Sequence, residues 1–246
     1  MDEKATEKEG KKSRMTSLAA LLREHDEAVK QFSYILLFVI AIFAMTFLDI
    51  NVNTFNFFMF LFVIVAVALI IFLIKRIIAS FFEIKLTNKR WITGLIFSMV
   101  GTLFLSALGT PILVPILNTQ EYARAKTLRG MKKGEVNLHE KWSISIFSSM
   151  AFLAFAMLFF GLFNAYKSQP FLDGGVFLTV YTFLNFFPYH KFDGAFLIYH
   201  NILIAAVFAI LALLTMVLSY INFIAGLSVF ILFVVFGFVS YRLKLW

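Results

Sequence analysis

Cysteine is absent from this chain of 246 residues. Its absence excludes structural disulfides, thiolate metal sites and cysteine nucleophiles, because each of these needs a cysteine sulfur. Charged residues are also scarce: Asp, Glu, Lys and Arg make up 15% of the chain, against about 25% in soluble domains. Any catalytic or metal-binding chemistry must therefore come from histidine, carboxylate or hydroxyl groups.

A high hydrophobic content accounts for this shortage of charge. Hydrophobic residues make up 61% of the chain, including 33 phenylalanines, whereas about half is usual in a soluble domain. This composition predicts an integral membrane protein surrounded by membrane lipid. The formal net charge of +8 comes from connections between apolar runs, where cations set orientation and meet anionic head groups. We therefore expect no nucleic acid among the partners.

The first 32 residues differ from the rest of the chain. Residues 1–14 are charged, with almost nothing to bury, which is typical of a disordered tail. From Thr16 onward, apolar residues recur at helical spacing opposite a charged face, so an amphipathic helix should lead into the membrane. This helix either lies on the membrane surface or docks a partner. The predicted division is a cytosolic segment at 1–32 and a transmembrane domain at 33–246.

Six apolar runs are long enough to cross a bilayer, which takes about 20 residues. They are 33–49, 55–74, 143–166, 176–199, 202–219 and 221–241. Such runs predict an all-α polytopic membrane protein with about six transmembrane helices. The chain shows no internal repeat, which disfavours a transporter built from inverted repeats.

A further apolar run, from Trp91 to Leu117, is interrupted by glycines and prolines. Lysine and arginine residues flank it on both sides, and such cations favour the cytoplasmic side. The run should therefore enter and leave on that side, as a helical hairpin or re-entrant segment. Arg242 and Lys244 favour the same side for the C-terminal end. We expect six crossings in the plasma membrane, with both termini cytoplasmic.

One segment near residue 190 places a carboxylate within an apolar run, which marks a candidate functional site. Its spaced residues are Asn185, Pro188, Phe192, Asp193 and Gly194. This Asn-x-x-Pro pattern, followed by an apolar residue and Asp-Gly, resembles the signature of the site-2 proteases, which are intramembrane zinc metalloproteases. In that family the aspartate is a zinc ligand.

The resemblance extends over residues 63–201. Ala79 and the run Phe82–Leu86 match the turn that follows the family's metal-binding helix, except that Glu83 stands at a glycine position. Counting back from Ala79, the family's His-Glu-x-x-His motif falls at Ile71–Lys75. Two histidines at this spacing share one zinc on a helical face, and the glutamate is the general base. The resemblance implies a site-2-protease-like core at about 55–201 and two extra helices at 202–241.

The catalytic positions of this motif are all replaced. Ile71 and Lys75 stand at the two histidine positions, and Phe72 stands at the glutamate position. Further along, Phe152 replaces an asparagine that lines the family's substrate cleft. The broken run at 91–117 is similar to the insertion of an archaeal branch of the family. The resemblance therefore implies a degenerate, inactive homologue without catalytic residues and without a metal cofactor.

Two arrangements around Asp193 remain open. Lys75 stands where a zinc ligand would be, and we expect it, or Arg76 beside it, to form an ion pair with Asp193 in place of the metal. Alternatively, His190, Asp193 and His200 supply three ligands for an atypical zinc site.

Three other polar patterns have plainer interpretations. His139-Glu140 has no second histidine four residues on, so it is interpreted as the polar lead-in to the span at 143. Leu172–Gly175 repeats Asp-Gly without Asn-x-x-Pro and is interpreted as an ordinary turn in an outside loop. A basic loop either orients the chain or binds anionic lipid or a partner, through Arg124, Lys126, Arg129, Lys132 and Lys133.

Three functions are compatible with these patterns. The first is a pseudoprotease that binds a transmembrane segment of another protein, as a scaffold, an adaptor or a subunit of a membrane complex. The second is an active intramembrane zinc peptidase at the atypical site. The third is a transporter or channel component, because charges inside a membrane often mark such proteins. The replaced motif favours the first.

Overall fold

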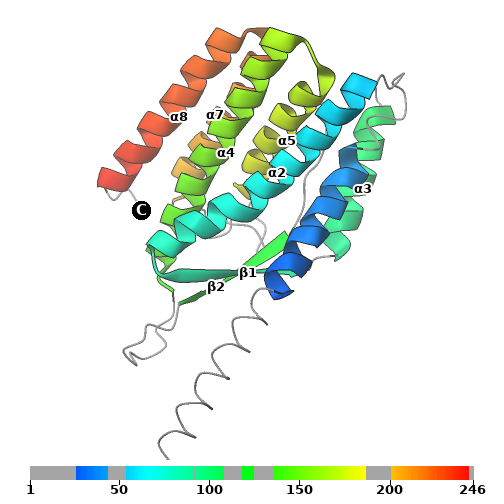
Figure 1. The fold of residues 1–246 in the computed structure, drawn as a ribbon. Coiled ribbons are helices and arrows are strands. Elements are labelled where there is room, and N and C mark those ends of the chain that lie inside the picture. The colour runs from blue at the N-terminus through cyan, green and yellow to red at the C-terminus, as the bar shows by residue number, and fades with distance from the viewer. Residues whose placement is uncertain are drawn as a thin grey trace, which may run out of the picture.

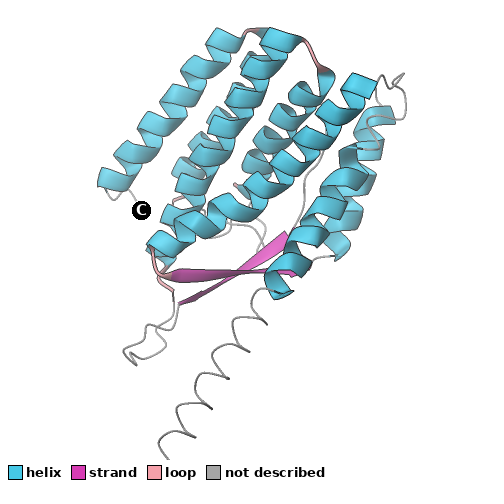
Figure 2. Ribbon diagram, in the orientation of Figure 1, coloured by secondary structure: helices cyan, strands magenta, loops and turns pink. Residues whose placement is uncertain are grey.

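The computed structural model describes residues 26–43, 54–90, 92–107, 118–124, 136–186 and 201–243. These residues form helices, apart from one two-stranded antiparallel sheet at one end of the bundle (Figures 1 and 2). The elements, in chain order, are a helix at 26–43, α2 (Thr54–Phe81), β1 (Ile84–Arg90), α3 (Ile92–Ala107), β2 (Asn118–Arg124), α4 (Leu138–Tyr166), α5 (Gln169–Asn185), α7 (Ile202–Ile221) and α8 (Phe223–Leu243).

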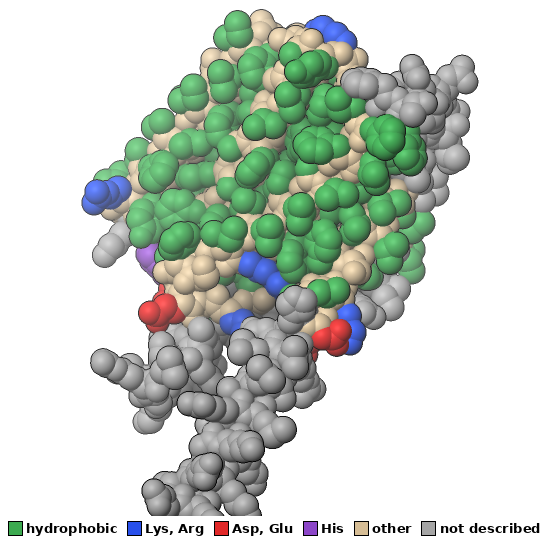
Figure 3. Space-filling model, in the orientation of Figure 1, with side chains coloured by type: hydrophobic (Ala, Val, Ile, Leu, Met, Phe, Trp, Pro, Cys, Tyr) green, Lys and Arg blue, Asp and Glu red, His purple; other side chains and the backbone are tan. Residues whose placement is uncertain are grey.

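The described part of the chain contains four helices long and apolar enough to cross a membrane. They are Phe57–Phe81, Leu138–Tyr166, Ile202–Ile221 and Phe223–Leu243. Large apolar side chains cover the face of the bundle shown in Figure 3, as a lipid environment requires. The predicted all-helical, membrane-type fold is therefore confirmed.

Helix α4 is the central element, in contact with α2, α5, α7 and α8. Two apolar clusters meet on it. The first cluster joins α4 to α2, α5 and the helix at 26–43, and the second joins it to α7 and α8. In the second cluster, Phe208 stacks on Phe186 and makes an edge contact with Phe233, with ring centroids 5.7 and 5.1 Å apart. Aromatic packing therefore holds α7 and α8 to the end of α5.

Helix α5 departs from the predicted span at 176–199. It begins at Gln169 and ends at Asn185, with Phe186 as its C-cap, and residues 187–200 lie outside the described part. The segment Leu172–Gly175, interpreted above as an outside turn, lies within this helix, so that interpretation was wrong. The predicted span began at 176, after the two glycines, whereas Pro170 lies in the first turn of the helix, where proline is well tolerated.

The two glycines of that segment bring α5 close to its neighbours. A Cβ atom at Gly174 would lie 2.8 Å from Val63 Cγ1 on α2. A Cβ atom at Gly175 would lie 2.9 Å from the Phe160 ring on α4. Small residues at helix contacts allow such approach in membrane bundles. The Asp-Gly-Gly pattern is therefore a packing feature of α5.

The insertion after α2 contains a sheet that the apolar pattern did not predict. Strands β1 and β2 pair with Ile84 opposite Arg124 and Arg90 opposite Asn118. Because Arg90 and Asn118 are partners, the residues that flank the run at 91–117 lie side by side. Between them, α3 spans 16 residues, or about 24 Å, and residues 108–117 lie outside the described part. Arg124, which was expected in a basic loop, is thus the last residue of a strand.

The helix at 26–43 runs continuously across the predicted division between residues 32 and 33. One face of it, which includes Ile35, Val39 and Ile42, is buried in the first cluster. Near its beginning, Phe32 meets Phe72 of α2 edge-on, with ring centroids 5.5 Å apart. Residues 26–32 of the predicted lead-in helix and the start of the first span are thus one element, packed on α2.

Candidate functional site

The positions at which the metal motif would lie are packed with apolar side chains. Ile71 and Phe72 on α2 are 3% and 9% exposed, and Phe152 on α4 is fully buried. All three belong to the first cluster. The Phe152 ring meets the Tyr181 ring of α5 edge-on, with centroids 5.3 Å apart. Apolar side chains therefore surround each of these three residues.

Lys75 lies one turn further along α2 and is 3% exposed. Helices α2 and α5 run in one direction and α4 runs in the other (Figure 1). One turn beyond Tyr181 along α5 is Asn185, and one turn before Phe152 along α4 are Ser148 and Ser149. These side chains are also buried. We call these four buried side chains, Lys75, Asn185, Ser148 and Ser149, the polar layer, because each lies one turn from Ile71, Tyr181 or Phe152 on its own helix.

Hydroxyl groups near this layer bond mainly to their own helices. Ser148 donates to the Ser145 carbonyl at 3.0 Å, and Thr182 donates to the Leu178 carbonyl at 2.8 Å. Such back-bonding satisfies a hydroxyl within an apolar helix. Ser149 Oγ is buried and makes no hydrogen bond with the part of the chain that the structure describes. The polar layer therefore still offers one buried donor and acceptor to a further group.

Most of the retained signature lies outside the described residues. Asn185 is the last residue of α5, whereas Pro188, His190, Phe192, Asp193, Gly194 and His200 fall in 187–200. The predicted ion pair and the alternative zinc site therefore stay predictions. Among the described residues, no group of three or more histidine or carboxylate side chains is arranged to hold a metal ion.

Only one residue of the predicted basic surface is described. Arg124 is the last residue of β2, where its Cα is the partner of Ile84. The other four residues fall in 126–135, outside the described part; they are Lys126, Arg129, Lys132 and Lys133.

Glu140 has a structural role at the start of α4. The Asn137 N–H donates to Glu140 Oε2 at 3.0 Å, which is the reach-back bond of a capping box. One turn after His139, the Ser143 hydroxyl donates to the His139 carbonyl at 3.0 Å. The interpretation of His139-Glu140 as a polar lead-in to the following span is confirmed.

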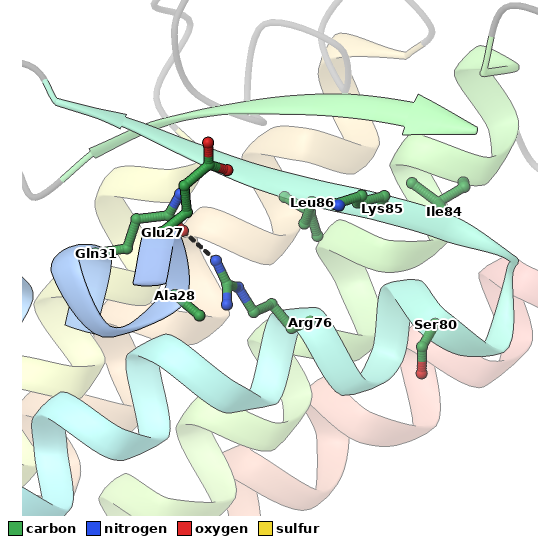
Figure 4. A pocket seen from close by; sticks show the side chains of 8 residues that line it. All are labelled: Glu27, Ala28, Gln31, Arg76, Ser80, Ile84, Lys85 and Leu86. Atoms are coloured by element: carbon green, nitrogen blue, oxygen red, sulfur yellow. Dashed lines mark hydrogen bonds between the residues drawn. The ribbon is translucent and has the colours of Figure 1, made fainter. Parts of the chain in front are cut away.

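A polar cavity that the sequence did not predict lies near the junction between the end of α2 and the start of β1. Its volume is about 220 Å³, and three elements line it. Glu27 and Gln31 come from the helix at 26–43, Arg76 and Ser80 from α2, and Lys85 from β1 (Figure 4). The only sequence signal for it was Arg76, a cation close to the end of an apolar run.

The Arg76 side chain is held in place from two sides. One terminal guanidinium nitrogen donates to Gln31 Oε1, and the guanidinium carbon lies 4.2 Å from the centre of the Phe72 ring. Figure 4 shows the guanidinium pointing from α2 toward the helix at 26–43. Stacking on an aromatic ring orients an arginine while leaving its edge donors in their plane. The cavity wall thus carries an oriented cation.

Comparisons of this chain with protein-family models, with curated proteins and with solved structures each found no match. The resemblance to the site-2 proteases therefore stays a prediction from the motif residues. Any functional proposal depends on those residues and on how the described helices arrange them.

Proposed function

We propose that this protein is a catalytically inactive relative of the site-2 proteases that acts as a scaffold in the membrane. In this role it binds a transmembrane segment of another membrane protein, as an adaptor or as a subunit of a complex. One observation carries the proposal: Ile71, Phe72 and Phe152 pack into a single buried apolar cluster where the catalytic motif would lie.

The chemistry of hydrolysis explains why this packing matters. A zinc peptidase needs ligands that hold the ion and a general base that activates its bound water. Isoleucine and phenylalanine supply neither, and here their side chains are buried among other apolar side chains. Lys75, one turn further along α2, is also buried, and its ammonium group would repel a metal ion and attract a carboxylate. The arrangement thus favours binding over catalysis.

The backbone at the end of α2 also supports the resemblance. Glu83 stands where the family pattern has glycine, and its φ is 56°. This left-handed conformation is the one that glycine adopts without strain. The backbone at Glu83 is therefore one that the glycine of the family pattern would adopt without strain.

The proposed topology has six crossings, with both termini cytoplasmic in the plasma membrane. Four helices meet the length and composition that a crossing needs. The helix at 26–43 and α5 would supply the other two, because both pack along α2 or α4 inside the bundle. Cysteine-scanning with a membrane-impermeant maleimide tests this topology, since the natural chain has no cysteine to interfere.

Metal analysis of the purified full chain tests the absence of catalysis. We expect no stoichiometric zinc. We also expect the unaltered chain to cleave transmembrane substrates no more than the Asp193→Ala variant does. Stoichiometric zinc that is lost in Asp193→Ala, together with cleavage, would overturn the proposal in favour of a site at His190, Asp193 and His200.

Partner recovery tests the scaffold role. Affinity purification in mild detergent should recover one membrane protein in a constant ratio to the tagged chain. Purification through a tag on that partner should then recover this chain in the same ratio. A chain that purifies alone, from membranes where it is made at its natural level, contradicts the scaffold role.

A further inference from the structure

The polar cavity at the end of α2 lies beside an exposed apolar face of the same helix. Leu73, Ile77 and Phe81 are exposed, and Phe81 is 81% exposed. They occupy the turns that carry Arg76 and Ser80, so the apolar face and the cavity are neighbours along α2. Figure 3 shows the boundary, where Lys and Arg side chains lie just beneath the apolar surface. A molecule filling the cavity would therefore lie at the edge of the membrane.

The charges that line this cavity have two signs. Arg76 and Lys85 are cations on neighbouring elements, and Glu27 is a carboxylate on the facing helix. Guanidinium and ammonium groups are the usual partners of phosphate oxygens. A carboxylate is the usual partner of an alkylammonium group. Together these groups complement a zwitterion with a phosphate at one end and an amine at the other.

We infer that this cavity binds the headgroup of a membrane phospholipid, with its phosphodiester on Arg76 and Lys85. Glu27 then favours a headgroup that carries a primary amine, as in phosphatidylethanolamine. Gln31 and Phe72 act indirectly, since they hold the Arg76 guanidinium in the orientation that receives the phosphate. The inference does not depend on the proposed scaffold function.

The size of the cavity supports a headgroup as its occupant. At about 220 Å³ it is smaller than the roughly 300–1,000 Å³ of sites that enclose a drug-sized ligand. It therefore takes the polar end of a lipid and leaves the acyl chains outside. Those chains would lie along Leu73 and Ile77, which are exposed on the apolar face of α2.

Native mass spectrometry of the purified full chain in detergent tests the inference. The added probes are short-chain phosphatidylethanolamine, short-chain phosphatidylglycerol and inorganic phosphate. We expect Arg76→Gln and Lys85→Met each to weaken binding of both lipids by about tenfold or more. Glu27→Gln should weaken binding of phosphatidylethanolamine and leave that of phosphatidylglycerol unchanged.

Arg242→Gln is the matched control. Arg242 is exposed in the last turn of α8 and lies outside the cavity, at the same end of the bundle (Figure 1). Arg242→Gln removes one positive charge, as Arg76→Gln does. Because that charge lies outside the cavity, the lipid affinities of Arg242→Gln should equal those of the unaltered chain. Glu27 and Lys85 are themselves exposed, so their variants should fold even if Arg76→Gln does not.

Three results would overturn the inference. One is unchanged lipid binding by both Lys85→Met and Glu27→Gln. The second is an equal loss of binding in Arg242→Gln, which would indicate a diffuse effect of charge. The third is displacement of lipid by equimolar inorganic phosphate, which would make a soluble anion the ligand.

Discussion

Gly226 of α8 lies against the backbone of Ser219 on α7: a Cβ atom at Gly226 would be 2.6 Å from Ser219 Cα and 2.0 Å from its Oγ. The two helices are joined by Asn222 alone, whose N–H donates to the Leu218 carbonyl at 2.7 Å. Because the connection is so short, the hairpin has no slack with which to move the helices apart. The glycine sets their separation.

Gly226→Ala should therefore destabilise the bundle by about 3 kcal/mol, the upper part of the range for an overpacked site. The added methyl group meets main-chain atoms, which cannot rotate away. Thermal unfolding in detergent, followed by circular dichroism, measures the loss. Adding Ser219→Gly should restore little of the lost stability, because the main-chain Cα and N atoms of residue 219 remain in place. Full recovery in that double variant would contradict the backbone clash.

Gly237→Ala offers a contrast on the same helix. Its Cβ atom would lie 1.8 Å from Met150 Cε on α4, which is the far end of a flexible side chain. Methionine has three rotatable bonds and adapts to irregular space, so we expect a loss of about 1 kcal/mol. Met150→Ala should relieve Gly237→Ala and leave Gly226→Ala unrelieved. Equal relief of both alanine variants in the same unfolding assay would contradict this account.

Glu83→Gly should stabilise the protein by about 0.5–1 kcal/mol. Glu83 follows α2 with a φ of 56°, and its N–H donates to the Ser80 carbonyl at 3.0 Å. A side chain in the left-handed region is strained, and glycine removes the strain while keeping this bond. The midpoint of thermal unfolding measures the change. Lys167, with a φ of 52° after α4, is the matched control, and Lys167→Gly should stabilise by a similar amount.

Apolar run length predicted four of the helices, α2, α4, α7 and α8, because crossing a bilayer is a constraint that single segments reveal. The ends of the helices were harder to predict. The segment Leu172–Gly175 was interpreted as a turn, although it lies within α5 and Gly174 packs that helix on α2. The sheet was missed because β1 and β2 are polar and separated by 27 residues, so neither strand shows its partner locally.

The candidate site, like the fold, was predicted only in part. Replacement of the catalytic motif is visible in the sequence, because it concerns which residues are present at 71–75. The burial of Ile71, Phe72 and Phe152 in one cluster needs three helices to be placed together. The cavity at Arg76 was not foreseen, because Gln31 and Lys85 reach it from two other elements. No spacing rule connects those residues.

Glu140→Ala should destabilise the start of α4 by about 1 kcal/mol, since it removes the carboxylate that accepts from the Asn137 N–H. Glu140→Gln keeps an acceptor at the same place and should cost less. Hydrogen exchange at the first turn of α4 measures the local effect. Asp173→Asn, a carboxylate change in α5 far from this cap, should leave exchange at α4 unaltered. Equal exchange in Glu140→Ala and the unaltered chain would contradict a capping role.

Lys75 and Asp193 should behave as a coupled pair. Lys75 is buried on α2, and leaving either charge alone in the membrane interior is expected to cost about 3–5 kcal/mol. Lys75→Met and Asp193→Leu should therefore each lower the free energy of unfolding by that amount. The double variant, which removes both charges, should be close to the unaltered protein. Unfolding in mixed detergent micelles provides the four free energies of the cycle.

A second cycle, which combines Lys75→Met with Asp173→Leu, is the matched control. The Asp173 carboxylate accepts from Gln169 Nε2 at 3.0 Å near the beginning of α5. Lys75→Met and Asp173→Leu should be additive, because these groups lie too far apart to interact. Additivity in the Lys75 and Asp193 cycle as well would show that the buried ammonium has another counter-charge.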